Sequence, residues 1–239
     1  MANDKLPEHP KEEISVFEGL WENGYFEGDP LNPYGNSRYF GPMRFMSVLH
    51  VIYLTCIKPY VSGNTTALEI GPGRGAWTRA MLGANEVWCL DAVSAKDNNF
   101  WEYVGTTSNV KYFQVSDFSC SMLPDNTFDY LFSFGVFCHI PFANIQEYMG
   151  SLYPKLKAGA HCFIMVADYE KYNAAYDKLP NMEKVPILDT NEDQVIRPGR
   201  WFHAGCKRTC DMLNELGYEI LDPDVGASHR DPIIHFRKM

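Results

Sequence analysis

Residues 67–80 carry the strongest structural signal in the chain and read ALEIGPGRGAWTRA. A short apolar run containing an acid is followed by glycines at alternate positions, and the next residues fit the first turns of a helix. This order predicts a β-strand, a tight turn and a helix start. Glycines suit such a turn because it needs unusual backbone angles, and because a Cβ would keep a ligand away from the backbone. We therefore expect the loop to hold a cofactor.

Two kinds of cofactor fit the glycine spacing. Gly71, Gly73 and Ala76 loosely satisfy the dinucleotide fingerprint, in which a pyrophosphate rests on the helix N-terminus, so a nicotinamide cofactor stays open. Glu69 argues against it, because a carboxylate two residues before the first glycine would repel a diphosphate. The same carboxylate suits a ligand with cationic ammonium and sulfonium groups, and that ligand is S-adenosylmethionine.

The motif acid-x-Gly-x-Gly-x-Gly, carried by Glu69, Gly71, Gly73 and Gly75, resembles the first motif of the class I S-adenosylmethionine-dependent methyltransferases. That resemblance implies methyl transfer with S-adenosylmethionine as cofactor. Together with the alternation of strands and helices, it predicts an α/β fold: a Rossmann-like, doubly wound, mostly parallel sheet of about seven strands with an N-terminal helical extension. The resemblance covers roughly residues 65–170 by motif and the rest by topology only.

Composition and charge narrow the class of substrate. The chain has 239 residues, of which 46% are apolar and 21% charged, as in ordinary globular proteins. Its net charge of −9 provides no basic field to attract polyphosphates, so we expect no nucleic-acid partner. A small-molecule acceptor is favoured instead.

The cysteines and the N-terminal residues indicate which cellular compartment and which bound metals to expect. The seven cysteines are odd in number and most lie in apolar runs, which predicts reduced core side chains. We find no His/Cys set with zinc spacing and expect no metal. The first residues lack the basic and apolar segments of a signal peptide, and no apolar run reaches ~18 residues, so we expect a cytoplasmic protein without a membrane partner. A homodimer is compatible with the sequence, which does not fix the oligomeric state.

The domain organisation follows from the hydrophobic patterns. We expect residues 1–62 to form a leader and a helical cap or lid, and residues 63–239 to form the methyltransferase domain, with an insertion at about 169–200. The cap would contain helices at 13–21 and 43–60. In the domain we expect strands at 66–70, 87–91, 110–115, 128–134, 161–167, 218–221 and 233–236, and helices at 76–82, 96–104, 141–156 and 202–216.

Further cofactor contacts are expected where strands end, because ligands of doubly wound sheets bind at the carboxyl ends. Asp91 ends the second strand and can accept both ribose hydroxyl protons, while Ala92 would pack against adenine. The resemblance implies that Asp117, after the third strand, bonds the adenine amino group. It implies also that Phe118 reads the adenine ring.

Residues 128–141, FDYLFSFGVFCHIP, resemble the family's fourth motif. The resemblance implies that Ser133 and Phe134 lie beneath the methionine part of the cofactor and that His139 lies where the acceptor meets the methyl group. A neutral imidazole there can take a hydroxyl proton. Asp168, after the fifth strand, could orient the imidazole or act on the acceptor itself. This pair is similar to that of metal-independent sugar O-methyltransferases, and predicts O-methylation of a sugar or glycosylated metabolite.

Several alternatives stay open. His139 can equally be a helix-start residue that only lines the pocket. Metal-dependent O-methyltransferases place an acid where this chain has Ser133 and Phe134, so no catalytic metal is expected. The Asn/Asp-Pro-Pro-Tyr signature of methylation on amide or ring nitrogens is absent from the sequence. The remaining candidates are an N- or C-methyltransferase of a small metabolite, a non-catalytic cofactor-binding module and an NAD-dependent oxidoreductase.

Candidate acceptor contacts lie outside the core sheet. Aromatic side chains stack on sugar or ring faces, and an arginine could hold a carboxylate or phosphate. The candidates are Tyr25, Phe26 and Tyr34 in the N-terminal loop and Tyr169, Arg200, Trp201 and His203 around the late insertion.

Overall fold

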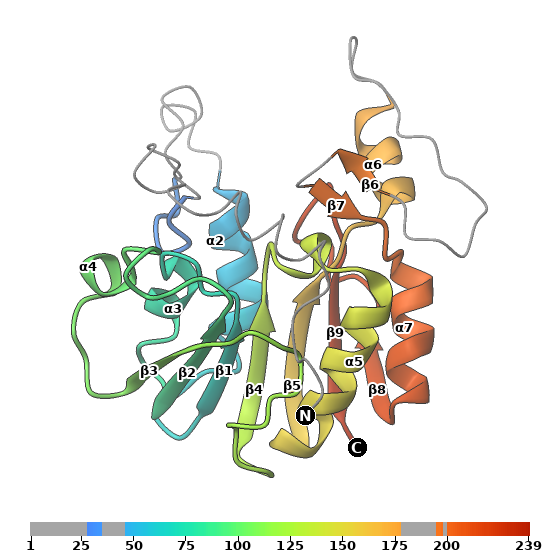
Figure 1. Cartoon of the computed structure of the whole chain (residues 1–239). Helices are drawn as coiled ribbons and strands as arrows, with labels where there is room; N and C mark the ends of the chain where they lie inside the picture. Colours follow the sequence, from blue (N-terminus) through green and yellow to red (C-terminus); the bar gives the residue numbers. More distant parts are fainter. Residues whose placement is uncertain (1–27, 35–45, 178–194, 198–199) are drawn as a thin grey trace.

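The computed structural model describes residues 28–34, 46–177, 195–197 and 200–239. In this part of the chain a seven-stranded sheet is flanked by helices on both faces (Figure 1). The strands of the sheet are β1 (Thr66–Ile70), β2 (Glu86–Asp91), β3 (Val110–Gln114), β4 (Phe128–Ser133), β5 (Leu156–Met165), β8 (Tyr218–Asp222) and β9 (Ile233–Lys238). Their order across the sheet is β3-β2-β1-β4-β5-β9-β8. The predicted Rossmann-like sheet is confirmed.

The order in which the chain builds the strands places a topological switch point in the middle of the sheet. β1 to β5 run parallel, and β9 runs antiparallel to both of its neighbours, β5 and β8. From β1 the chain builds outward through β2 to β3 and then returns to place β4 on the other side of β1. Ligands of such sheets bind at the carboxyl ends of the strands beside this switch point. Here it lies between β1 and β4.

Two layers of helices cover the sheet. α2 (Val48–Ile52), the π-helical turn η1 (Tyr53–Ile57), α3 (Ala76–Ala80) and α4 (Phe100–Val104) share one apolar cluster with one face. α5 (Phe142–Leu152) and α7 (Cys206–Glu215) share a second cluster with the other. The remaining elements are η2 (Phe137–His139), η3 (Tyr153–Lys155), α6 (Tyr169–Tyr176) and a two-stranded ribbon of β6 (Val195–Arg197) and β7 (Arg200–Phe202).

β1 shows why the sheet is buried on both sides. Successive side chains of a strand point to opposite faces. Leu68 and Ile70 therefore pack in the α5–α7 cluster, whereas Ala67 packs in the α3–α4 cluster. All three are buried, as expected for a central parallel strand, which reads as a nearly continuous apolar run. Glu69 has the parity of Ala67 and points toward α3.

The fifth strand begins earlier than predicted. β5 starts at Leu156, whereas the sequence predicts a strand from residue 161. The pairing explains the difference, because Phe128 of β4 lies opposite Leu156 but Tyr130 lies opposite His161, so β5 carries extra residues in a bulge. Gly159 in the bulge has φ +80°, which glycine adopts readily.

The segment after β5 is more regular than predicted. Its first part, Tyr169–Tyr176, is helix α6, and the predicted last helix begins only at Cys206. Gly205, with φ +74°, lies directly before α7, and its N–H donates to the carbonyl of Ala167 at 3.1 Å. That hydrogen bond attaches the segment to the end of β5, so the helix cannot start at Phe202.

The N-terminal predictions are tested only in part. The helix predicted at 13–21 lies outside the described residues. The apolar helix predicted at 43–60 is present as α2 and η1, with Ile52 and Cys56 buried but Val48 43% exposed. The proposed division into a cap and a domain stays a prediction.

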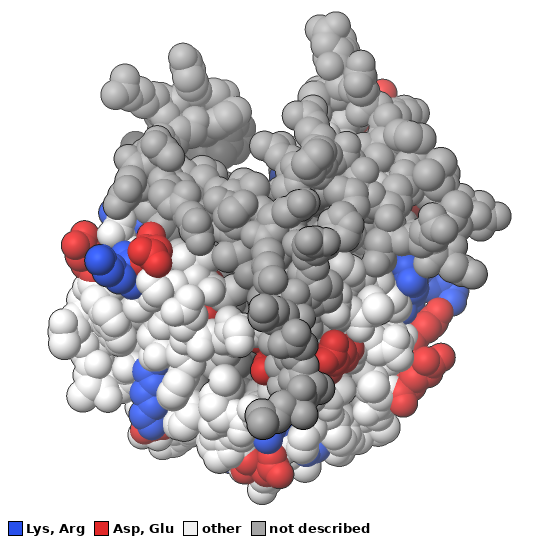
Figure 2. Space-filling model, in the orientation of Figure 1, with Lys and Arg blue, Asp and Glu red and all other residues white. Residues whose placement is uncertain are grey.

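The described surface carries charges of both signs, and the cysteines are not joined to one another by disulfides. On the described part of the face in Figure 2, acidic and basic side chains are interspersed rather than gathered in one large patch. The seven cysteines are free thiols, and five of them are buried. None of the helices within the described ranges has the length and apolarity needed to span a membrane.

Candidate cofactor and acceptor site

The loop between β1 and α3 requires glycine. Gly71, Gly73 and Gly75 have φ values of +67°, +52° and +99°, a region that other residues rarely adopt. A Cβ on Gly71 would overlap with Val136, and a Cβ on Gly75 would overlap with Val104. The loop therefore packs tightly against the side chains beneath it, which leaves no room for a Cβ at Gly71 or Gly75.

Asp91 is attached to this loop. Its Oδ2 accepts the N–H of Gly73 at 3.0 Å, and its Oδ1 accepts the N–H of Val93 at 2.8 Å. The N–H of Gly71 donates to the carbonyl of Leu90 at 2.7 Å, which holds the loop against the end of β2. The glycine loop and Asp91, which are predicted from separate parts of the sequence, are thus joined by a hydrogen bond.

The ionisation of Asp91 is perturbed. Burial raises the pKa of its carboxyl from 3.8 to about 6, and the N–H donors of Val93, Gly73 and the Asn98 side chain partly oppose the rise. The Ala92 N–H is a fourth donor to the carboxyl, and all four stabilise its ionised form, which can only accept hydrogen bonds. Asp91 can therefore bind a ribose hydroxyl near neutral pH.

Glu69 lies below the loop rather than on its surface. Its side chain is 1% exposed, and its Oε2 accepts the hydroxyl of Thr78 on α3 at 2.5 Å and the thiol of Cys89 at 3.7 Å. The carboxylate thus links β1 to α3 and contributes negative charge from beneath the seat. Thr78 was not identified from the sequence as a partner of Glu69, although it lies in the first turn of the predicted helix.

The residues after β3 have their own local contacts. Asp117 accepts the N–H and the hydroxyl of Ser119 at 2.8 and 2.7 Å, so it closes a turn. Phe118 is buried, and its ring lies 5.3 Å from that of Tyr148 on α5. The adenine contacts of Asp117 and Phe118 stay predictions, as does that of Ala92, whose carbonyl accepts the Gln114 side-chain amide at 3.1 Å.

The end of β4 joins the end of β1. The hydroxyl of Ser133 donates to the carbonyl of Ile70 at 3.1 Å, directly before the glycine loop. The ring of Phe134 packs on Trp77 of α3 at 5.0 Å. After these residues the chain forms η2, which contains His139, partly exposed at the carboxyl end of β4. His139 is thus brought to the same edge of the sheet as the loop.

Asp168 acts on helix ends. Its Oδ1 accepts the N–H groups of Glu170 and Lys171 at 2.9 and 3.0 Å, which makes it the N-cap of α6. Its Oδ2 accepts the N–H of Cys206, the first residue of α7, at 2.7 Å. Both carboxylate oxygens are therefore engaged by backbone donors, and this favours a structural role over the predicted contact with the His139 imidazole.

Only some of the predicted acceptor contacts lie within the described residues. Tyr25 and Phe26 lie outside the described residues, as do the side chains of Arg200 and Trp201, whose backbone forms β7. Tyr34 is 56% exposed.

Tyr169 and His203 lie together beside the start of α6. Tyr169 is buried, and its ring stacks on His203 with centroids 4.7 Å apart. The N–H of Tyr169 donates to His203 Nδ1 at 3.1 Å, and burial lowers the pKa of His203. His203 is therefore a neutral ring fixed at the C-terminal side of the sheet.

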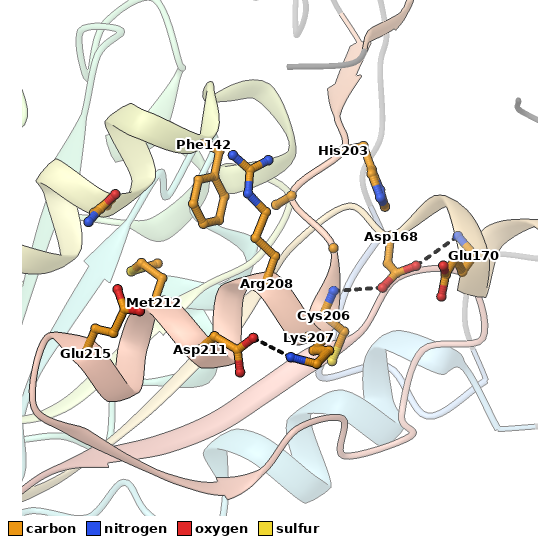
Figure 3. Close-up of a pocket in the computed structure, with 13 residues that line it drawn as sticks. Phe142, Asp168, Glu170, His203, Cys206, Lys207, Arg208, Asp211, Met212 and Glu215 are labelled. Atoms are coloured by element: carbon orange, nitrogen blue, oxygen red, sulfur yellow. Dashed lines mark hydrogen bonds and ion pairs between the residues drawn. The ribbon is translucent and has the colours of Figure 1, made fainter. Parts of the chain in front are cut away.

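A pocket of about 530 Å³ opens beside these residues, between the first turn of α5 and α7 (Figure 3). Asp168, His203 and Arg208 line it, and the Arg208 guanidinium lies 3.7 Å from the centroid of the Phe142 ring. The residues lining it do not include the glycine loop or Asp91. The pocket is therefore separate from the cofactor seat. In the described ranges no three His, Cys, Asp or Glu side chains gather as a metal-ligand set.

Comparison with known proteins indicates the kind of domain to which the seat belongs. Residues 68–164 match a family model described as a methyltransferase domain. The chain therefore carries an S-adenosylmethionine-dependent methyltransferase domain over these residues. The matched range contains the glycine loop, Asp91 and His139, so the family assignment rests on the part of the chain in which the site was predicted. S-adenosylmethionine is the cofactor of this methyltransferase.

Solved structures share the fold of the methyltransferase at low sequence identity. An S-adenosylmethionine-dependent methyltransferase from Mesorhizobium loti is 15% identical, with a TM-score of 0.60 over 80% of this chain and 98% of that chain. A putative one from Listeria monocytogenes is 15% identical, with a TM-score of 0.57 over 73% of this chain and 90% of that chain. A DhpI–SAM–HEP complex is 18% identical, with a TM-score of 0.59 over 98% of this chain and 100% of that chain. No curated protein gives a significant match.

The residues present in the methyltransferase fit the cofactor. The glycines keep side chains off the loop backbone, at positions where a Cβ would collide with the base of the seat. Asp91 supplies a hydroxyl acceptor beside the loop, and the carboxyl group of Glu69 lies buried beneath it. We expect Gly71, Gly73 and Asp91 to hold the cofactor.

Proposed function

We propose that the enzyme methylates a hydroxyl group of a small molecule, such as a sugar or a glycosylated metabolite, and that His139 is the general base. The observation that carries this proposal is the position of His139 in η2, at the carboxyl end of β4 and beside the switch point of the sheet. A group at that edge can meet an acceptor bound over the glycine loop.

The alternative base is disfavoured by its contacts. Asp168 is 7% exposed and accepts backbone N–H groups of α6 and α7 on both oxygens. Taking a proton would weaken those hydrogen bonds, because a protonated carboxyl is a poorer acceptor. We therefore assign Asp168 to the support of the acceptor side and the proton transfer to His139.

The chain's own residues contribute orientation and proton transfer. When bound, S-adenosylmethionine supplies the electrophilic methyl group. The glycine loop and Asp91 hold the adenosine, and Ser133 keeps the ends of β1 and β4 together through the Ile70 carbonyl. The neutral imidazole of His139 accepts the acceptor's hydroxyl proton as the oxygen attacks. Holding the acceptor oxygen in line supplies much of the acceleration.

The acceptor side is proposed from the flanking segments. Residues 1–62 and the insertion at about 169–200 would complete the acceptor pocket as a cap. In and directly beside these segments we propose Tyr25, Phe26, Tyr34, Arg200 and Trp201 as acceptor contacts. Tyr169 and His203, stacked beside the start of α6, would form the floor.

A variant of the proposed base tests this function. A panel of hydroxylated small molecules is incubated with S-adenosylmethionine carrying a labelled methyl group, and the product is identified by mass spectrometry. With the acceptor so found, we expect His139→Ala to lower kcat about 10²- to 10⁴-fold while leaving cofactor affinity within threefold. His161→Ala, on β5 beside His235, is the matched control and should retain kcat.

Other outcomes would replace the proposal. A product methylated on nitrogen or carbon would show that the acceptor class is wrong. Cofactor binding without transfer to any member of the panel would favour a binding module. A kcat of His139→Ala within threefold of wild type would leave positioning alone as the source of catalysis.

A further inference from the structure

Asn98 is a buried amide that no part of the proposed mechanism uses. It lies in the segment between β2 and α4, is 2% exposed and hydrogen-bonds the Asp91 carboxyl through its side chain. Its Nδ2 also donates to the hydroxyl of Tyr112 on β3 at 2.8 Å. A buried amide costs free energy unless it is hydrogen-bonded, so these partners explain how the position tolerates one.

The hydrogen bonds around Asn98 form a closed ring. The hydroxyl of Tyr112 donates to the carbonyl of Val93 at 2.7 Å, and the N–H of Val93 donates to Asp91 Oδ1 at 2.8 Å. Asn98 closes the ring by bridging Tyr112 and Asp91. The ring thus connects β3, the turn after β2 and the carboxylate at the cofactor seat.

The directions of these bonds fix the orientation of the amide. Because Tyr112 gives its hydroxyl hydrogen to Val93, its oxygen must accept from Asn98. An ionised Asp91 can only accept as well. Both partners therefore need an N–H, and the NH₂ group of Asn98, which has two, satisfies both. Only the ionised form of Asp91 has both oxygens free to accept, so the ring favours that form.

We propose that Asn98, held by Tyr112, is a positioning residue that keeps Asp91 ionised and aimed at the ribose hydroxyls of the cofactor. The proposal rests on the assignment of Asp91 to the cofactor seat. Neither Asn98 nor Tyr112 touches the cofactor in this account. Their effect passes through Asp91, and it should appear in how cofactor affinity depends on pH.

Other ionisable groups around Asp91 do not obscure that dependence. Cys89 on β2, Tyr112 on β3 and Tyr148 on α5 have pKa values raised by burial, so they stay neutral through the tested range. Glu69 on β1, which contacts Cys89, is unchanged in every variant, so it affects all of them alike. Differences between variants therefore report on Asp91.

The test measures the dissociation constant of S-adenosylhomocysteine by calorimetry between pH 5 and 9. In the wild type we expect affinity to fall below a midpoint near pH 6. Asn98→Ala should move the midpoint up by about one pH unit, because a donor to the ionised form is lost. Its affinity should be about threefold weaker at pH 6.5 and close to wild type at pH 9. Tyr112→Phe, which keeps the ring against Phe100, should shift the midpoint in the same direction by less.

Asn109→Ala is the matched control. The Asn109 amide also donates to two acceptors, the carbonyls of Leu82 and Ala84 at 3.1 and 3.0 Å, but it lies before β3 and away from Asp91. It should lower thermal stability without moving the midpoint. If Asn98→Ala does not fold, Tyr112→Phe alone decides the test.

The outcomes separate the inference from the assignment on which it rests. A wild-type midpoint in Asn98→Ala and Tyr112→Phe, with affinity lowered equally at every pH or not at all, would overturn the role of Asn98. If Asp91→Asn binds S-adenosylhomocysteine as tightly as wild type, the assignment of Asp91 itself is wrong.

Discussion

Gly75 shows how much of the seat depends on single residues. Its φ of +99° lies in the left-handed region, and a Cβ would overlap with Val104 and the ring of Phe100. Gly71 is restricted in the same two ways, by its φ and by Val136. These glycines could be identified from their spacing in the sequence, but the side chains that exclude a Cβ could not, because they come from α4 and from the loop after β4.

Gly75→Ala should therefore lower the free energy of unfolding by about 2–4 kcal/mol, through backbone strain and overpacking together. Thermal and urea denaturation measure the change. Gly83→Ala is the matched control, because no atom lies within 4 Å of the added Cβ and the φ of Gly83 is not in the left-handed region. Equal stability of the two variants would show that the loop relaxes around a Cβ.

Asp91 should make cofactor binding and stability respond to pH in opposite directions. Burial raises the pKa of its carboxyl to about 6, whereas the ordinary value is 3.8. Affinity for S-adenosylmethionine should fall as pH drops below about 6, by up to tenfold per pH unit. The contribution of Asp91 to stability is fully present below pH ~4 and is lost as pH rises through 6.

Calorimetric titrations and thermal melts of the wild type and Asp91→Asn between pH 5 and 8 check both signs. The variant should bind weakly with no dependence on pH in this range. A wild-type affinity that stays constant from pH 5 to 7 would contradict the assigned ionisation of Asp91.

At the scale of elements, α6 and α7 depend on one carboxylate. Asp168 caps α6 and also accepts the first N–H of α7, so two helices on the acceptor side start from the end of β5. The sequence indicated an acid after the fifth strand and suggested catalysis. The capping role could not be predicted, because Cys206 is far away in the sequence and α6 was interpreted as part of an irregular insertion.

Asp168→Ala should lower the free energy of unfolding by about 2–3 kcal/mol, since three backbone donors lose their acceptor. Asp168→Asn should be less destabilising and should retain kcat within about threefold. Asp211→Ala, which removes an exposed pair with Lys207, is the control and should leave the melting temperature unchanged. A stable Asp168→Asn variant with kcat reduced a hundredfold would restore Asp168 as a catalytic residue.

The elements show where sequence patterns were sufficient. β1, β2 and β4 were predicted to within a residue, because central parallel strands are apolar runs bounded by glycine or acid. β5 and α7 were misplaced because their starts depend on a bulge at Gly159 and on the bond between Gly205 and Ala167. Such contacts between distant segments leave no local pattern.

For the whole molecule, the sheet order explains how separate motifs become one site. The return of the chain from β3 to β4 brings the glycine loop, Asp91 and η2 to one edge of the sheet. The motif residues predict the cofactor at that edge, and the range matched by the family model contains them. Asn98 was missed because the polar segment around it gives no sign of which residue is buried.

Calorimetry with two ligands shows whether this edge of the sheet takes a cofactor with a sulfonium group or one with a diphosphate. S-adenosylmethionine and NAD⁺ are titrated separately into the wild-type protein at pH 7.5. We predict saturable binding of one S-adenosylmethionine per chain and no detectable binding of NAD⁺, since the Asp91 carboxylate beside the seat is ionised at this pH and repels a diphosphate. Binding of NAD⁺ with equal or higher affinity would contradict the account.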